Sequence, residues 1–385
     1  MLRNLFIEGY RPFFLLAALN AWASMFPWLY MLSGGEVPTQ GWPPQSLHAH
    51  EMIYGTVVAV IAGFLLTAVP NWTSTARVSG APLIGLVLFY VAGRAGLVLS
   101  GSLNAVWAAG IDVTFLPLVA FFVGRPILQT RNWRNLPIVA VLLGLALANA
   151  AIHRGVLQSD HVMLRAGTYG SVYLVVTLMM IISGRVVPAF TRNALRRSGV
   201  EVHVSNRRIV GPLSIATACS ALIVDLILPG SFVGAGFALV AAPLLLLRQS
   251  GWQVGKTLGQ PMLWILHVGH AWLALGFACS GVANAFGVGI GAAALHAFTA
   301  GAMGTLMLGM MPRVSLGHLG RPIEATPATI WMFALVIVGA VVRIAGTMGP
   351  AELYRPSVLL GGGLWASAWI VFSIYYSRIL FEPAQ

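Results

Sequence analysis

The sequence predicts an all-helical protein that crosses a membrane about twelve times, and three observations predict it. The 385 residues are 58% hydrophobic and only 8% charged, whereas about a quarter of the residues in an ordinary soluble domain are charged. Apolar segments of membrane-spanning length follow one another along the chain. The basic residues gather in alternate loops between those segments. We therefore expect one integral membrane domain over residues 1–385.

The individual spans follow from segment length. A helix needs about 20 apolar residues to cross the hydrocarbon core, and proline and glycine mark the gaps between helices. The predicted spans are 12–32, 46–70, 81–100, 105–124, 136–153, 163–188, 209–228, 232–248, 260–280, 288–311, 328–347 and 357–377. No small-residue cleavage site follows the first residues, so the first span is expected to be an uncleaved helix. The longest gap, 189–208, is too short for a soluble domain.

Charge placement tests the number of spans. With a cytoplasmic N-terminus, sixteen of the 22 basic residues fall in inner loops or termini, and three fall in outer loops. This asymmetry is the positive-inside signature, so both termini are expected in the cytoplasm. The net charge of +12 is spread over segment ends rather than gathered in a basic tract. The expected surroundings are therefore a lipid bilayer, and nucleic acid is not an expected partner.

A histidine enters an apolar segment twice, each time with the same spacing to a glycine. His50 precedes Gly63 by thirteen residues, and His296 precedes Gly309 by thirteen. Imidazole inside lipid is costly unless something binds it, so such residues are candidates for a functional site. A haem or a copper ion is the natural occupant of a pair of intramembrane histidines. A lone helical histidine is more often packed than ligating, but the recurrence favours metal or haem.

Further histidines lie near these two in the predicted topology. His48 and His50 start the second span, and they face different ways if that region is helical. His267 and His270 lie three apart in the ninth span and share a helix face. His296 lies about 12 Å into the tenth span, at 1.5 Å per residue. These five histidines are predicted to converge in the outer half of the membrane.

Charged side chains beside the histidines are the next candidates. Glu51 is the carboxylate directly beside candidate ligands. It would orient a ligating histidine, coordinate copper or accept protons. Haem propionates need cations, and Arg94, Arg165 and Arg343 are placed near the outer boundary. For Arg94 an ion pair with Asp112 in the neighbouring span is the alternative, and for each intramembrane arginine a structural ion pair is favoured over a propionate contact.

For three of the remaining four histidines we expect no metal-binding role. His318 lies in an inner loop and is either a metal ligand or a loop residue. His153 ends the fifth span and, like His161, is expected at the surface. His203 lies in a basic inner loop and is expected to be solvated.

Sulfur-containing residues and cofactor motifs add little. Cys219 and Cys279 lie in separate apolar segments and are interpreted as small buried hydrophobes. Met303, Met307 and Met310 fall at helical spacing, which would suit copper export through thioether ligands, but packing is the favoured explanation. No glycine-rich dinucleotide or phosphate-binding motif follows a strand, and the Gly361–Gly363 run is expected to start a helix and to allow close packing. Electrons would therefore come from quinol or from another protein.

Seven stretches of the chain together carry a resemblance to a known family: Gly9–Phe14, His48–Met52, Gly63–Thr73, Gly184–Asn193, Leu266–Gly269, Leu295–Gly301 and Arg313–Arg321. With these stretches the chain resembles the NnrS family, and the similarity runs over essentially its whole length. The sequence departs from the family after His267, where tyrosine rather than His270 is expected three residues on.

The resemblance implies a twelve-span inner-membrane protein that contains haem, of the b type, and copper. It also implies a link to nitric oxide metabolism and to resistance against nitrosative stress in denitrifying and pathogenic bacteria. From this resemblance we expect His50 and His296 to bind haem. We expect His267 and His48 to bind copper or to serve as a second axial ligand of the haem. Glu51 is expected to orient a ligand or to carry protons. His270 and His318 stay as further candidate ligands.

The second and tenth spans also look like those of haem–copper oxidases and nitric oxide reductases. Those enzymes have paired histidines in the tenth span and a histidine pair for copper in the seventh. This chain has His296 alone in the tenth span and no histidine in the seventh. A complete oxygen-reducing binuclear centre is therefore not expected.

Three functions remain open on the sequence. An oxidoreductase would consume nitric oxide with a reductant. A sensor or buffer would bind the gas without turnover. A transporter of copper, haem or a nitrogen species would need no bound haem, and its signature would be flux into liposomes.

Overall fold

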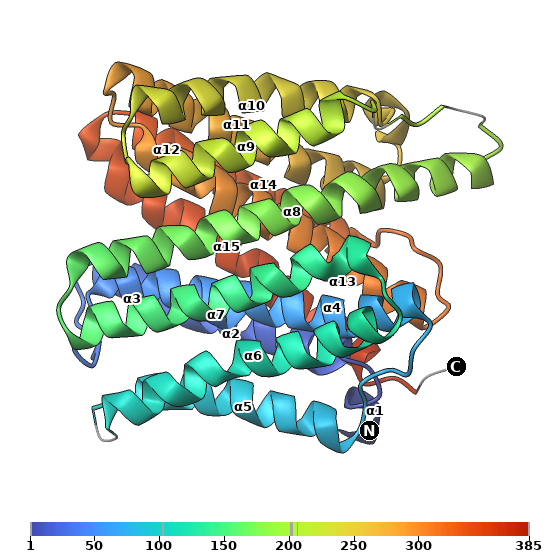
Figure 1. Ribbon diagram of the computed structural model, residues 1–385, viewed down its shortest axis with the longest axis horizontal. Coiled ribbons are helices and arrows are strands. Elements are labelled where there is room, and N and C mark those ends of the chain that lie inside the picture. The colour runs from blue at the N-terminus through green and yellow to red at the C-terminus, as the bar shows by residue number, and fades with distance from the viewer. Residues whose placement is uncertain (1, 102–103, 201–202, 206, 384–385) are drawn as a thin grey trace. The chain divides into compact units, whose positions relative to one another are not determined.

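The computed structural model describes residues 2–101, 104–200, 203–205 and 207–383. Within these residues the chain is helical and has no β-strand, as the sequence predicts. Twelve helical stretches of the described chain are long and apolar enough to cross a membrane. The protein is therefore a multi-pass membrane protein, as expected (Figure 1).

The twelve observed spans match the predicted ones in order, with ends that differ by a few residues. Two short helices, α1 (Leu2–Leu5) and η3 (Val254–Thr257), lie outside them. The spans are α2 (Tyr10–Leu32); α3, η1 and α4 (Pro44–Thr73); α5 (Ala81–Val98); α6 (Ala105–Gln129); η2 and α7 (Trp133–Leu157); α8 (His161–Arg197); α9 (Val210–Ile227); α10 (Phe232–Ser250); α11 (Pro261–Phe286); α12, η4 and α13 (Gly291–His318); α14 (Pro327–Met348); and α15 (Ala351–Leu380).

Local chemistry explains many of the helix ends. Proline lies in the first turn of α3, α5, α7, α11 and α14, where its missing N–H costs no hydrogen bond. The side chains of Asn104, Ser231 and Thr326 cap α6, α10 and α14 by accepting a backbone N–H. The helix α11 ends at Phe286 and is followed by Gly287, whose φ of +63° suits glycine.

Two predicted ends are wrong because a proline lies inside the helix. α8 continues past Pro188 to Arg197, and α13 continues past Pro312 to His318. Neighbouring helices can satisfy the backbone groups that a proline frees within a membrane helix. His318 therefore ends a helix rather than lying in a loop. The glycine run at 361–363 likewise lies inside α15 and does not start it.

The second and tenth spans both change from α-helix to π-helix directly after their histidine. The π-helical turn η1 (Glu51–Val57) follows His50, and η4 (Ala297–Met303) follows His296. Such turns are rare and are frequent at functional sites. The structure thus adds a shared backbone feature to the shared histidine–glycine spacing.

The spans that carry candidate histidines are also the most enclosed. In the apolar window of each span, 83% of the second, 67% of the ninth and 72% of the tenth is buried, against at most 50% of any other. A side chain on these three helices therefore meets protein more often than lipid.

The chain forms two compact units. Unit 1 is Met1–Leu174 with Val314–Arg321 and Phe372–Gln385, and unit 2 is Val175–Arg313 with Pro322–Val371. In unit 1, α2 and α6 pack on α4, and α5 and α7 pack on α6. In unit 2, α10 packs between α9 and α11, and α11 also contacts η4.

Both ends of the chain belong to unit 1 and lie at the same end of it (Figure 1). Asn4 Nδ2 donates to the Phe381 carbonyl at 3.1 Å, and Arg11 Nη1 donates to the Leu380 carbonyl at 3.2 Å. An even number of spans returns the chain to its starting side, so this contact agrees with the twelve spans.

Candidate metal centre

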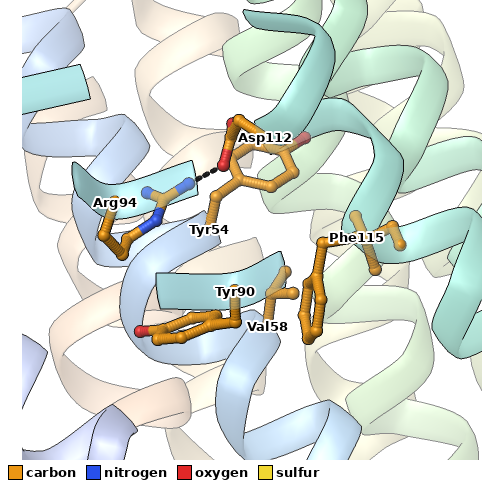
Figure 2. A pocket seen from close by; sticks show the side chains of 7 residues that line it. Tyr54, Val58, Tyr90, Arg94, Asp112 and Phe115 are labelled. Carbon is orange, nitrogen blue, oxygen red and sulfur yellow. Dashed lines mark ion pairs between the residues drawn. The ribbon is translucent and has the colours of Figure 1, made fainter. Parts of the chain in front are cut away.

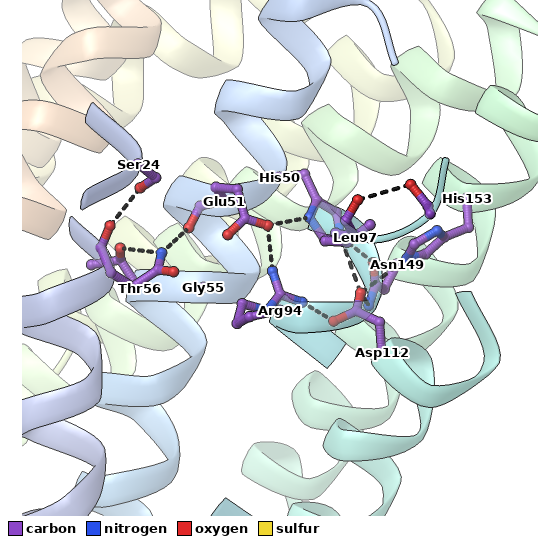
Figure 3. Close-up of polar contacts among 12 residues, drawn as sticks. Ser24, His50, Glu51, Gly55, Thr56, Arg94, Leu97, Asp112, Asn149 and His153 are labelled. Carbon is purple, nitrogen blue, oxygen red and sulfur yellow. Dashed lines mark hydrogen bonds and ion pairs between the residues drawn. The ribbon is translucent and has the colours of Figure 1, made fainter. Parts of the chain in front are cut away.

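His50 is the centre of a buried polar cluster in unit 1 (Figure 3). It ends α3 (Pro44–His50) and is 1% exposed. Its Nε2 lies 3.1 Å from Asp112 Oδ2 and 2.9 Å from Asn149 Oδ1, and its Nδ1 lies 3.3 Å from Glu51 Oε1. The Asn149 amide donates to Asp112 Oδ2 at 2.8 Å, which turns its oxygen towards His50.

The buried cluster around His50 contains one more negative charge than positive charges. All three atoms that face its ring nitrogens are acceptor oxygens, whereas a neutral imidazole has a single N–H to donate. Glu51 and Asp112 supply two carboxylates, and Arg94 supplies one guanidinium that is ion-paired to both. With neutral histidines, the buried cluster has a net charge of −1. A proton or a metal cation would complete it.

His153 brings a second imidazole to Asp112. It lies four residues after Asn149 on α7, so both side chains share a helix face. Its Nε2 lies 2.9 Å from Asp112 Oδ2. His153 is 5% exposed, so its expected place at the surface is wrong. In the sequence, the spacing of Asn149 and His153 indicates a shared helix face and Asp112 stands inside an apolar span, but neither feature shows that the three side chains meet.

Three of these side chains are arranged to hold an ion. His50, Asp112 and His153 each offer one ligand atom, and these atoms all lie within 4.8 Å of one another. Metal–nitrogen and metal–oxygen bonds are about 2.0–2.2 Å long, so a single ion would bind all three atoms after shifts of a few tenths of an ångström. Imidazole and carboxylate together suit Cu²⁺ or Zn²⁺.

Aromatic side chains enclose the cluster. Trp42 lies over His50 and His153, with ring centroids 5.0 and 5.3 Å away. Tyr54 stacks on His50 at 4.9 Å, and its hydroxyl donates to the Leu145 carbonyl at 2.9 Å. These rings leave little water around the charges, which strengthens their interactions.

A small cavity borders the cluster on one side (Figure 2). It has a volume of about 10 Å³, close to the space that one water needs. Its walls include Tyr54, Tyr90, Arg94, Asp112 and Phe115. The cavity is therefore far too small for a porphyrin.

Other candidate residues of unit 1 are not members of the triad. His48 stacks on Trp28, with ring centroids 4.6 Å apart and planes at 11°. Glu51 contacts both His50 and Arg94. His318 is ion-paired to Glu8 at 2.9 Å.

In unit 2, His267 and His270 both face hydroxyl groups of α8. His267 Nε2 lies 3.1 Å from Thr191 Oγ1, and His270 Nδ1 lies 3.0 Å from Ser183 Oγ. The other ring nitrogen of each histidine is buried and has no hydrogen-bond partner. An unpaired buried nitrogen costs free energy, so each of them is a position where a ligand would be favourable.

His296 has the arrangement typical of a metal ligand. Its Nδ1 lies 2.8 Å from the Ala292 carbonyl one turn earlier. An N–H donated there leaves the lone pair on Nε2, which is how a backbone carbonyl orients a ligating histidine. Arg343, on α14 of the same unit, has a buried Nη1 without a hydrogen-bond partner, and its guanidinium lies 5.4 Å from the Tyr354 ring.

The model of the NnrS protein family matches residues 4–384. The chain belongs to the NnrS family. Comparison with individually curated proteins yields no match. Membership of the NnrS family fits a nitric-oxide-related membrane protein, and the family is associated with binding of metal and haem.

The described residues fit both groups that go with the NnrS family. For a small ion, Nε2 of His50 points at Asp112 while its Nδ1 can donate to Glu51, which is a carboxylate–histidine–metal arrangement. For haem, His296 offers a free Nε2 and Arg343 offers an unpaired donor for a propionate. Arg94, in contrast, is already ion-paired to Glu51 and Asp112.

Proposed function

We propose that this NnrS protein is a haem- and copper-containing protein of the bacterial inner membrane that binds or turns over nitric oxide. The observation that carries the proposal is the buried cluster around His50. Its two carboxylates, single guanidinium and acceptor-facing imidazole favour a bound cation in apolar surroundings, where an unbalanced charge is expensive.

The small ion is proposed at His50, Asp112 and His153. Their ligand atoms are close enough to share one ion, and Glu51 would accept the Nδ1 proton of His50 and fix its orientation. Histidine and carboxylate are common ligands of copper. Asn149 would hold Asp112 Oδ2 by a hydrogen bond.

The haem is proposed in unit 2, on His296. The carbonyl of Ala292 directs the tautomer of His296, and Arg343 would neutralise a propionate. His267 or His270 is proposed as a further ligand, since each has a buried ring nitrogen without a partner. His50, which sequence analysis placed on the haem, is better suited to the small ion because an aspartate, an asparagine and a second histidine surround it.

When bound, the haem would supply a site for nitric oxide, and the copper would supply a place for an electron or a second ligand. The protein residues do the rest. Glu51 and the His50 imidazole can hold and pass a proton, and Tyr54 and Trp42 exclude water. Nitric oxide is small and apolar and reaches a site within lipid without a wide cleft. Electrons would come from quinol or from a protein donor.

The test is nitric oxide consumption by purified full-length protein with an added reductant, measured with an electrode. Wild-type protein is expected to remove nitric oxide or to bind it stoichiometrically, and His296→Ala is expected to lose both. His161→Ala changes an exposed histidine and should behave as wild type. Nitric oxide binding that is equal in wild-type and His296→Ala protein would contradict the proposal.

A further inference from the structure

A cavity of about 430 Å³ lies in unit 2, and none of the candidate metal and haem ligands lines it. Its walls come from the last turn of α8, the first turn of α11, Arg313 of α13 and the segment before α14. These elements bring Arg197 and Arg313 to the same cavity. Both arginines are among the sixteen basic residues that the predicted topology assigns to the cytoplasmic loops and termini. The cavity therefore lies at the cytoplasmic side in that topology.

Arg313 is far more buried than a topology signal should be. It is 6% exposed and lies inside α13 rather than in a loop. Its Nη1 donates to the Met262 carbonyl at 3.0 Å, and its guanidinium lies 4.4 Å from the Phe190 ring. These contacts fix the orientation of the guanidinium without neutralising its charge.

The charge of Arg313 has no counter-ion in the described part of the chain. No carboxylate there lies within 4.0 Å of Arg313 or of Arg197, and Nε of Arg313 is buried without a hydrogen-bond partner. Removing a charge from water is costly unless it is paired. The arrangement is therefore incomplete as it stands, and an anion would complete it.

Two further features of the cavity favour an anion. The helix α11 begins at Pro261 in its wall, and the N-terminus of a helix carries a partial positive charge. Glu324 is the one carboxylate in the wall, and it is exposed, so solvent screens its charge more than that of Arg313.

We propose that this cavity binds a phosphate group. Its volume is in the range of small-molecule sites and leaves room for more than a bare ion. Guanidinium groups recognise phosphate by charge-assisted hydrogen bonds, and basic pockets between membrane helices on the cytoplasmic side bind phosphate head groups. The phosphate comes from an anionic lipid or from a soluble phosphate compound. The site is independent of haem and copper.

The experiment uses full-length protein in neutral detergent with two probes, phosphatidylglycerol and inorganic phosphate. Lipid binding is measured by native mass spectrometry and phosphate binding with radiolabelled phosphate. Arg313→Gln is expected to weaken binding of the recognised probe by about tenfold or more, and Arg197→Gln by several-fold. Arg208→Gln, an exposed arginine of the neighbouring loop, is the matched control and should bind as wild type.

Each outcome decides the proposal. Binding of phosphatidylglycerol alone assigns the site to a lipid headgroup, and binding of inorganic phosphate alone assigns it to a soluble compound. Wild-type protein that binds neither probe, or binding that Arg197→Gln leaves unchanged, overturns the proposal. Arg197 is exposed, so its variant should fold even where Arg313→Gln does not, and Arg313→Lys keeps the charge as a second check.

Discussion

At the scale of single residues, the central feature is the buried carboxylate of Asp112, which lies among one guanidinium, two imidazoles and one amide. Asp112 contacts Arg94, His50, His153 and Asn149. Sequence analysis identified His50 as a candidate and considered the pairing of Arg94 with Asp112. It missed His153 and Asn149, because their contacts with Asp112 join residues 41 and 37 positions apart. No local pattern contains such tertiary contacts.

Asp112→Asn tests the charge balance of the cluster. The change leaves Arg94 with Glu51 alone and removes the carboxylate between the two histidines. Glu51 still balances the charge of Arg94, but the buried groups that contact Asp112 lose their carboxylate partner, so we expect a loss of roughly 1–3 kcal/mol of stability together with loss of the bound ion. Thermal unfolding in detergent and metal analysis measure the two effects. Glu352→Gln, at an exposed site, should change neither, and unchanged stability of Asp112→Asn would contradict the ion-pair description.

Arg94→Gln separates two roles for this arginine. A propionate contact predicts that haem is lost, whereas the ion pairs with Glu51 and Asp112 predict that haem is kept. We expect haem absorbance per protein to stay at the wild-type level while the melting temperature falls. We also expect added copper to restore part of the melting temperature, since it replaces the missing positive charge. Loss of haem would assign Arg94 to a propionate after all.

At the scale of helices, sequence analysis predicted the order and number of the spans, because segment length and hydropathy are local properties. It did not predict the π-helical turns after His50 and His296, since no residue type marks them. It ended two helices at Pro188 and Pro312, where the structure continues them. Proline is a weaker helix breaker inside a membrane bundle than in water.

The crossing of α14 and α15 depends on small residues. A Cβ added at Gly361 would lie 2.9 Å from the Gly339 carbonyl oxygen and 3.0 Å from the Arg343 backbone nitrogen, whereas one added at Gly363 meets open space. We expect Gly361→Ala to destabilise the protein by about 1–3 kcal/mol through overpacking. Gly363→Ala should be neutral or stabilising. Melting temperatures in detergent compare the pair, and equal values would contradict the close crossing.

At the scale of the whole molecule, the sequence predicted that the protein crosses a membrane twelve times. It also predicted that the chain ends on the side on which it begins, because the number of spans is even. The contact between the two chain ends agrees with an even number of spans. What the sequence could not predict is the division into two compact units, one with the His50 cluster and one with His267, His270 and His296. Three of the four boundary points lie inside the helices α8, α13 and α15, and the fourth lies in the segment between α13 and α14, so no change of composition marks most of the boundary.

Topology is tested by reporters fused to the C-terminus. With both termini in the cytoplasm, green fluorescent protein should fluoresce there and alkaline phosphatase should stay inactive, because its disulfides do not form in that compartment. A phosphatase fusion truncated in the predicted outer loop after Ser100 provides the positive control. An active phosphatase at the C-terminus would contradict the predicted cytoplasmic position of the C-terminus, and therefore either the orientation or the even number of spans.

The central claim is that buried side chains far apart in the sequence hold a metal ion, and His153 tests it most directly. X-ray absorption at the copper edge of gently extracted full-length protein should show nitrogen and oxygen ligands at about 2.0–2.2 Å. His153→Ala should lose that signal while His161→Ala keeps it. Wild-type protein free of copper and other metals, or an identical spectrum from His153→Ala, would contradict the account.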